Sequence, residues 1–271
     1  MIDFISVIIT SFNRPIFLQR AINSVLNQDF KGETDLIIID DGSECDVTFI
    51  EQQYGAKLRL IRQKNLGVSA ARNNGVKLAQ ADWIAFLDDD DLWHRDKLAK
   101  QVKYLQDNPT YNICYTDEIW LRNNIEIKKK KKHQKYSGDV FAQLLKNMFI
   151  APSSVLLKRD VFTQIGLFSQ DLQICEDYDF FLRLLSKMPI LFLNEELVTR
   201  IAGHAGQLSG QIDEIELVRI KILQKLLTEK LTKMQSDLVT QMLNQKVEIY
   251  QKGAKKRGKD FKLLDLNPES N

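Results

Sequence analysis

The stretch Ile84–Trp93 reads IAFLDDDDLW and places four consecutive carboxylates directly after an apolar run. A short apolar run of this kind is typical of a buried strand. In open sheets with parallel strands, ligands bind beyond the carboxyl ends of the strands. The carboxylates Asp88–Asp91 therefore predict a polar binding crevice at the end of a core strand.

The chain around this stretch alternates between strand-like and helix-like segments. We expect strands over residues 5–10, 36–39, 58–62 and 83–87, and helices over residues 17–26, 48–54, 69–79 and 97–106. Such alternation predicts an α/β fold with a mostly parallel sheet flanked by helices. Two other strands also end in polar residues, Thr10-Ser11 and Asp40-Asp41, and their ends should converge on the same crevice.

The second half is less regular and then changes character. Strands are expected over residues 113–121, 154–157 and 190–193, and short helices over residues 161–165 and 180–185. After Gly210 the apolar residues recur at helical spacing, which predicts an amphipathic extension. We therefore divide the chain into a catalytic domain over residues 1–210 and a helical extension with a basic tail over residues 211–271.

The extension must bury its apolar stripe. It can pack on its own domain, pair with a second subunit as a homodimer, or lie on a membrane surface. The membrane alternative would use the basic residues of the tail, namely Lys252, Lys255, Lys256, Arg257 and Lys259. We favour packing together with self-association.

The composition limits the binding partners and the cell compartment that we expect for this chain. The 271 residues carry 38 Lys and Arg against 36 Asp and Glu, and a net charge of +2 argues against a dedicated nucleic-acid binder. Three widely spaced cysteines favour a reducing, cytoplasmic compartment. No apolar run is long enough to span a bilayer, so we expect any membrane contact to be peripheral. The run Lys128–Lys132 is interpreted as a solvated loop or hairpin tip, or as a patch for an anionic acceptor or lipid surface.

A crevice lined by carboxylates suits a divalent cation. Mg²⁺ and Mn²⁺ prefer oxygen ligands and often bridge protein carboxylates to substrate phosphates. A bound cation would also offset the repulsion among Asp88–Asp91. The alternative is that Asp91 caps the following helix, which would explain one carboxylate but not four.

Five stretches occur in an order that resembles the family 2 glycosyltransferases. They are SVIITSFNRP, IIIDDGS, NLGVSAARNNGV, FLDDDDLW and ICEDYDFFLRL, which together lie within about residues 4–210. This resemblance implies the GT-A fold, inverting transfer, and a nucleotide-sugar donor, commonly a UDP-sugar, held by Mn²⁺ or Mg²⁺. It also implies a glycan or lipid-linked acceptor and a place in surface polysaccharide or glycan synthesis.

The resemblance carries roles onto single residues of this sequence. Thr10 and Phe12 fall where the family contacts the nucleoside, although core packing is an equal alternative for Phe12. Asp41 matches the acid that accepts a hydrogen bond from the base, with a turn role beside Gly42 as the alternative. Arg72 matches a residue that reaches the nucleotide or its diphosphate, and the alternative is that it forms only a surface ion pair. Asp88 and Asp89 match ribose and metal contacts, and Asp90 matches the direct metal ligand.

Inverting transfer also needs a base, because the acceptor hydroxyl must lose its proton as it attacks. Asp177 aligns with the family's base in a Glu-Asp pair. The alternative is that Asp177 and Asp179 only complement the dipole of the helix that follows. His204 lies in a Gly-His-x-x-Gln-Leu-Ser stretch like that of some members, where an imidazole could complete the metal shell or pair with phosphate. An exposed loop histidine without a role is the alternative.

Two other functions remain open from the sequence. A sugar-nucleotide nucleotidyltransferase would usually carry a Gly-rich loop after the first strand, where this chain reads SFNRP. A non-catalytic protein that binds nucleotide-sugars is not favoured, because the candidate base and metal ligands are present.

Overall fold

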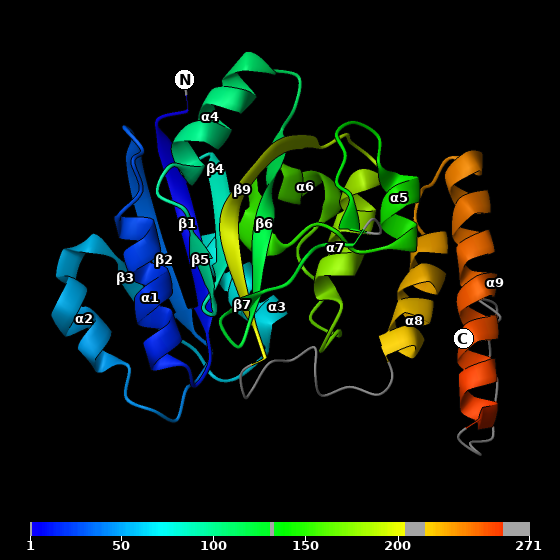
Figure 1. Cartoon of the computed structure of the whole chain (residues 1–271), viewed down its shortest axis with the longest axis horizontal. Coiled ribbons are helices and arrows are strands. Elements are labelled where there is room, and N and C mark those ends of the chain that lie inside the picture. Colours follow the sequence, from blue (N-terminus) through cyan, green and yellow to red (C-terminus); the bar gives the residue numbers. More distant parts are fainter. Residues whose placement is uncertain (1, 131–132, 204–214, 257–271) are drawn as a thin grey trace.

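The computed structural model describes residues 2–130, 133–203 and 215–256. Within these residues the chain forms one mixed sheet with the order β3-β2-β1-β4-β8-β6-β9-β5, with β7 added at β6 (Figure 1). The strands are β1 Phe4–Ser11, β2 Glu33–Asp40, β3 Arg59–Arg62, β4 Trp83–Asp88, β5 Asp91–Trp93, β6 Ile113–Arg122, β7 Ile125–Glu126, β8 Val155–Lys158 and β9 Leu191–Ala202.

The helices cover both faces of this sheet, which confirms the predicted α/β class. They are α1 Pro15–Leu26, α2 Thr48–Tyr54, α3 Val68–Leu78, α4 Lys97–Asp107, α5 Phe141–Lys146, α6 Val161–Ile165, α7 Glu176–Leu185, α8 Ile215–Leu227 and α9 Lys233–Lys256. Short 3₁₀ turns occupy Gly55–Lys57 and Pro152–Ser154.

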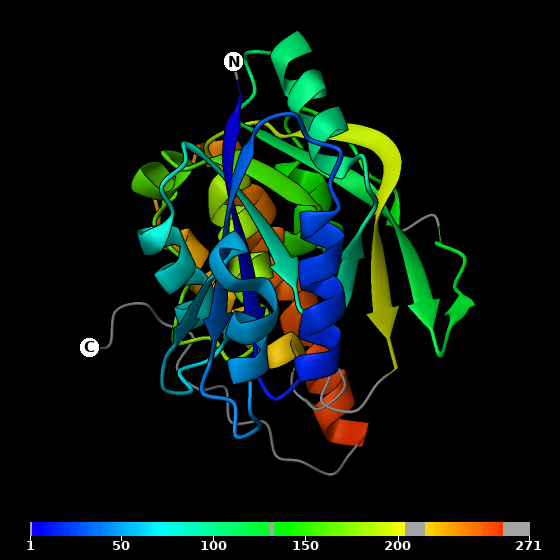
Figure 2. The same cartoon turned by 90° about the vertical axis from the view of Figure 1, so that its left-hand side faces the viewer.

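Alternation along the strands separates two hydrophobic cores. In β1, Ile5, Val7 and Ile9 pack with α1, α2 and α4 on one face, where α1 crosses in front of the sheet in Figure 2. Ile8 faces the opposite core, which includes residues of α3, α5, α6 and α7. α3 approaches this face closely, because a Cβ at Gly75 would lie 2.4 Å from the side chain of Ile8. The small residues of the AARNNG stretch thus fix the position of Arg72.

Parallel pairing brings the polar strand ends to one edge. Thr10 of β1 is in register with Asp88 of β4, and Ser11 is in register with Asp40 of β2. The expected convergence of these strand ends is therefore confirmed. Helix α1 starts at Pro15, a residue well suited to the first helical turn, and this start places Arg14 at the same edge.

The C-terminal helices pack against the rest of the described chain. Figure 1 shows α8 and α9 side by side, next to α5 and α7. Ile222, Leu223 and Leu226 are buried in the same core as Phe180 of α7. The guanidinium of Arg219 also lies 5.5 Å from the ring centre of Tyr178. Packing on the same chain, the first of the three expected arrangements, is confirmed for these helices.

Two expectations about local structure were wrong. Asp91 does not cap a helix: it opens β5, which pairs with β9, and α4 begins only at Lys97 after Asp96. The last strand does not end near residue 193 but continues to Ala202, because β6 pairs with it along that length. Arg200–Ala202 are therefore strand residues. Among the described residues, no helix is long and apolar enough to cross a bilayer.

Candidate active site

A pocket of about 750 Å³ opens at the converging strand ends. Its lining includes Thr10, Phe12, Asp41, Arg72, Asp88, Asp89, Asp90 and Asp177, which are all the sequence-predicted site residues except His204. His204 lies outside the described residues. The structure thus brings together side chains that are up to 167 positions apart in the sequence, from Thr10 to Asp177.

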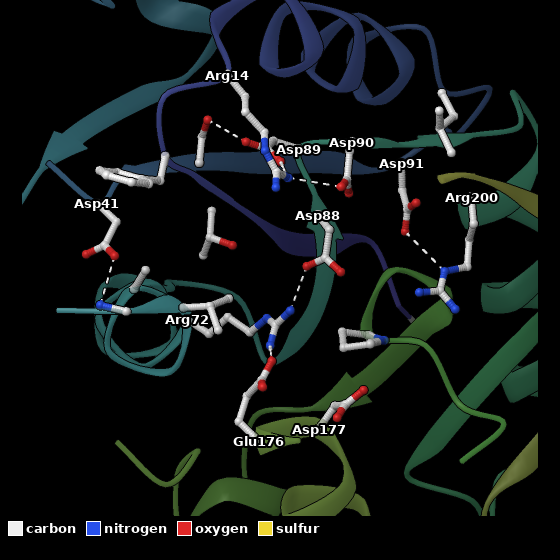
Figure 3. A pocket seen from close by; sticks show the side chains of 18 of the residues that line it. Arg14, Asp41, Arg72, Asp88, Asp89, Asp90, Asp91, Glu176, Asp177 and Arg200 are labelled. Atoms are coloured by element: carbon white, nitrogen blue, oxygen red, sulfur yellow. Dashed lines mark hydrogen bonds and ion pairs between the residues drawn. The ribbon is translucent and has the colours of Figure 1, made fainter. Parts of the chain in front are cut away.

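Three arginines pair with the four consecutive carboxylates (Figure 3). Arg72 Nη2 lies 2.6 Å from Asp88 Oδ1, and Arg14 Nη1 lies 3.0 Å from Asp89 Oδ1 and 2.9 Å from Asp90 Oδ2. Arg200 Nε lies 3.8 Å from Asp91 Oδ2. Three guanidinium groups of the protein therefore offset part of the repulsion within this cluster.

Asp89 and Asp91 are buried more deeply than their neighbours. Burial raises the pKa of Asp89 to about 6, although the Arg14 guanidinium acts in the opposite direction. The Ser11 hydroxyl donates a hydrogen bond of 2.7 Å to Asp89. Burial also raises the pKa of Asp91, against the effect of Arg200. Both residues therefore support the wall of the pocket, whereas the half-buried Asp88 and Asp90 are better placed to meet a ligand.

Asp41 holds the loop that follows β3. Its Oδ1 accepts hydrogen bonds from the Leu66 N–H at 2.9 Å and from Gln63 Nε2 at 2.8 Å, and its Oδ2 accepts one from the Gly67 N–H at 2.9 Å. Asp41 therefore does more than shape the turn beside Gly42, because it also fixes the loop over residues 63–67. The carboxylate also lines the pocket, where Oδ2 retains capacity to accept a further hydrogen bond.

The structure excludes the alternative roles considered for Phe12, core packing, and for Arg72, a surface ion pair. Phe12 is 41% exposed and lines the pocket, so it is not a core residue. Arg72 is only 3% exposed, so its ion pairs are not surface pairs. Its Nη1 lies 2.7 Å from Glu176 Oε1, and its Nε is buried without a hydrogen-bond partner. The ion pairs with Asp88 and Glu176 therefore fix the guanidinium at the lining of the pocket.

Asp177 and Asp179 lie in the same helical turn but have different surroundings. Asp179 is buried and its Oδ2 lies 2.7 Å from Arg183 Nη2, so it serves the packing of α7. Asp177 is half-buried, lines the pocket and accepts a 2.7 Å hydrogen bond from the Tyr178 N–H. Burial and the charge of Glu176 raise the pKa of Asp177 to about 6, although Arg72 acts in the opposite direction. A carboxylate with such a pKa is well suited to accept a proton near neutral pH.

Sequence reasoning missed several residues of this pocket. Arg14 carried no predicted role, although it follows the first strand in the same stretch as Phe12. Arg200 and Trp120 line the pocket from adjacent strands, and they became visible only when β6 and β9 were found to pair. Ser153 accepts a 3.0 Å hydrogen bond from the Asp88 N–H and so fixes the end of β4. No local pattern in the sequence marks these contacts.

The fold and its acidic pocket define a class of protein, the glycosyltransferases with a GT-A-like fold. The model of the family "Glycosyl transferase family 2" matches residues 6–166, and the chain belongs to this family. The resemblance seen in the five sequence stretches is therefore confirmed.

Two relatives illustrate the match in sequence. A glycosyltransferase of Rickettsia felis is 34% identical over 204 residues, which is 73% of this chain but 33% of the relative. A glycosyltransferase of Haemophilus influenzae is 31% identical over 187 residues, covering 68% of this chain and 62% of the relative. The chain thus spans about a third to three fifths of the length of these relatives.

Two solved structures show the same fold. S. aureus TarS residues 1–349 in complex with UDP-GlcNAc superposes with a TM-score of 0.74 at 16% identity, covering 92% of this chain and 74% of that one. The mannosyltransferase PcManGT from Pyrobaculum calidifontis, in complex with GDP-Man and Mn²⁺, gives a TM-score of 0.58 at 15% identity, with 93% and 79% covered. At these identities the likeness establishes the fold and not the substrate.

Proposed function

We propose that this chain transfers a sugar from a nucleotide-sugar, such as a UDP-sugar, to an acceptor hydroxyl with inversion at the anomeric carbon. One observation carries the proposal: a single pocket holds the carboxylate of Asp41, the Arg72 guanidinium and the Asp177 carboxylate. The nucleoside would lie between Phe12 and Asp41, and the diphosphate would lie near Arg72 and the carboxylates of β4. Relatives of this fold solved with UDP-GlcNAc and with GDP-Man support a donor of this class.

Asp177 would act as the general base, a role that its place in the pocket and its raised pKa support. The acceptor oxygen attacks the anomeric carbon and forms the new glycosidic bond, its proton passes to a carboxylate oxygen of Asp177, and the bond from the anomeric carbon to the diphosphate breaks. The nucleoside diphosphate leaves with the electron pair of that bond. Arg72, which binds both Asp88 and Glu176, would hold the diphosphate side and the base in fixed relation.

The carboxylate oxygens that line the pocket suit a divalent cation, Mn²⁺ or Mg²⁺. Asp90 offers carboxylate oxygens at the pocket, which are the ligands such ions prefer. The described residues contain no cluster of three His, Cys, Asp or Glu that could hold a metal alone. Further ligands would have to come from the donor diphosphate, from water, or from His204. A bound cation would neutralise charge on the leaving diphosphate.

We extend the proposal to the setting of the reaction. The acceptor would be a glycan or a lipid-linked saccharide in surface polysaccharide or glycan synthesis, and the protein would work in the cytoplasm, with any membrane contact peripheral. Self-association, and the division of the chain near residue 210, also belong to this proposal.

A thermal-shift screen of nucleotide-sugars with Mn²⁺ present tests the donor. A donor that binds the folded state raises the apparent stability by mass action. The Asp90→Ala variant should lose the metal-dependent part of UDP binding, measured by titration calorimetry with and without Mn²⁺, while its melting temperature without ligand stays near that of the wild type. Pyrophosphate formed from a nucleoside triphosphate and a sugar phosphate would instead indicate a nucleotidyltransferase.

A further inference from the structure

The side of the pocket formed by β6 and β9 carries an aromatic and a cationic side chain in adjacent positions. Trp120 of β6 is in register with Arg200 of β9, and both residues line the pocket. Figure 3 shows Arg200 and Asp41 on opposite sides of Asp88, with the Arg200 guanidinium directed towards the middle of the pocket. This side is therefore separate from the end proposed for the nucleoside.

One buried carboxylate fixes both side chains. Glu118 Oε2 accepts a 2.9 Å hydrogen bond from the Trp120 indole N–H and a 3.4 Å hydrogen bond from Arg200 Nη1. Glu118 is 1% exposed, and its other oxygen, Oε1, pairs with the buried ammonium of Lys135. Burial alone would raise the pKa of Glu118, but Lys135 and Arg200 lower it, so the carboxylate stays ionised. The orientation of the indole and the guanidinium is thus set before any ligand binds.

Apolar residues also line the pocket near Trp120 in the sequence and on the paired strand. Ile127, Ile201 and Ala202 line the same wall, and the Ile127 N–H donates a 2.7 Å hydrogen bond to the Trp120 carbonyl. His133 packs against the indole with ring centres 4.6 Å apart. A fixed indole in an apolar wall with one guanidinium beside it suits a ligand that has an apolar face and a polar rim. A pyranose ring has both, because its C–H groups form a face and its hydroxyls form an edge.

The charged residues of the pocket favour an uncharged acceptor ring over a negatively charged one. Its lining holds seven acidic residues against three arginines. Arg200 itself is shared between Asp91 and Glu118, so it does not offer an unbalanced positive charge. The charges that act on Arg200 come from Asp88, Asp91, Glu118 and Asp177. A carboxylate or phosphate placed beside Arg200 would therefore be repelled by these acidic residues, whereas an uncharged ring would not.

We propose that Trp120 and Arg200, oriented by Glu118, form the acceptor subsite and that it takes an uncharged sugar ring stacked on the Trp120 indole. The inference rests on the proposed transferase function, because the acceptor hydroxyl has to reach Asp177 in the same pocket. Trp120 and Arg200 then determine which acceptor binds, and Glu118 is the positioning residue for both side chains.

The indole N–H signals in a ¹H–¹⁵N spectrum test this subsite directly. The chain has three tryptophans, and the Trp120→Phe and Trp83→Phe variants assign their signals. The protein is titrated, with and without UDP and Mn²⁺, with methyl glycosides of glucose, galactose and N-acetylglucosamine and with methyl glucuronide. We expect at least one uncharged glycoside to shift the Trp120 signal saturably, and the glucuronide to bind more weakly.

Transfer assays give the second readout. Trp120→Phe keeps an aromatic core of smaller area, and Trp120→Ala should raise the acceptor KM by roughly tenfold or more through lost contact area. UDP affinity should be unchanged in both variants. Trp83 lies at the start of β4, away from the pocket at Asp88, so the Trp83→Phe variant should have the wild-type transfer rate. Trp120→Ala with an unchanged acceptor KM, or a Trp120 signal that no glycoside moves although UDP binds, would overturn the inference. Failure of the wild type to bind UDP would contradict the proposed donor function, whereas a glycoside-induced Trp120 shift without UDP would still support the subsite.

Discussion

Arg72 Nη1 lies 2.7 Å from Glu176 Oε1, so a helix of the first half of the chain is bonded to the residue just before the proposed base. The second terminal nitrogen of the same guanidinium, Nη2, lies 2.6 Å from Asp88 Oδ1 at the end of β4. One buried cation therefore links the carboxylates beside the proposed diphosphate position to the start of α7. Donor binding and placement of Asp177 should depend on it together.

The first prediction follows from this link. Arg72→Lys replaces a two-pronged donor with a single ammonium that cannot bond both carboxylates at once. We expect weaker UDP binding and a lower transfer rate, with stability lower by about 1–3 kcal/mol because one of the two carboxylates loses its hydrogen-bonded partner. Calorimetry and urea unfolding measure both effects. Arg159→Lys, at the more exposed ion pair with Asp82, is the matched control. Wild-type UDP affinity in Arg72→Lys would exclude this role.

The second prediction concerns the base. Asp177→Asn keeps the size of the side chain but cannot accept the proton, so the rate should fall by on the order of a hundredfold or more while UDP still binds. In the wild type, kcat/KM should fall as the pH drops below about 6, because the carboxyl becomes protonated there. Asp179→Asn serves as the neighbour control, since Asp179 pairs with Arg183. A kcat/KM that does not change between about pH 5 and about pH 8, on either side of the raised pKa, would speak against Asp177 as the base.

The third prediction concerns the stability of the same variant. The folded-state pKa of Asp177 is raised above the ordinary aspartate value of 3.8, to about 6. Ionisation therefore disfavours the folded state, and the wild type loses stability as the pH rises through this window. Asp177→Asn removes that cost and should be more stable than the wild type at pH 7, by roughly 1–3 kcal/mol, with a smaller difference at pH 4. Chemical unfolding at both pH values measures it, and equal stabilities at pH 7 would contradict the burial of an ionised carboxylate.

The fourth prediction concerns the C-terminal helices. Leu223 of α8 is fully buried in the core shared with α7. Leu223→Ala should lower the free energy of unfolding by about 2–5 kcal/mol. Met234→Ala, at a position that is 65% exposed, should leave it nearly unchanged. If both variants unfold at the same urea concentration, α8 does not contribute to the core in solution.

Much of this architecture could be predicted from local patterns. Apolar runs that end in Thr10-Ser11, Asp40-Asp41 and Asp88 located the parallel strands and their shared edge, because period and strand-end polarity are local properties. β9 was predicted too short, since its outer half is specified by pairing with β6 rather than by its own composition. Asp91 was misassigned for the same reason, because its partner Arg200 lies more than a hundred residues away.

The candidate site shows the same division. The five stretches identified residues that lie in local motifs, from Thr10 to Asp177. They did not indicate Arg14 as the partner of Asp89 and Asp90, nor the pairing of Trp120 with Arg200 through Glu118. These contacts depend on register between strands, which no single segment encodes. His204 stays a prediction from the sequence.

The stereochemistry of the first product tests the central claim most directly. The wild type and Asp177→Asn are incubated with UDP-GlcNAc, UDP-glucose, UDP-galactose or GDP-mannose, with Mn²⁺ and methyl glycosides, and the anomeric proton is followed by ¹H NMR. These donors are α-linked, so inversion predicts that the wild type consumes at least one of them and forms a β-linked product, whereas Asp177→Asn forms almost none. An α-linked product, or equal product from both proteins, would contradict a direct displacement with Asp177 as its base.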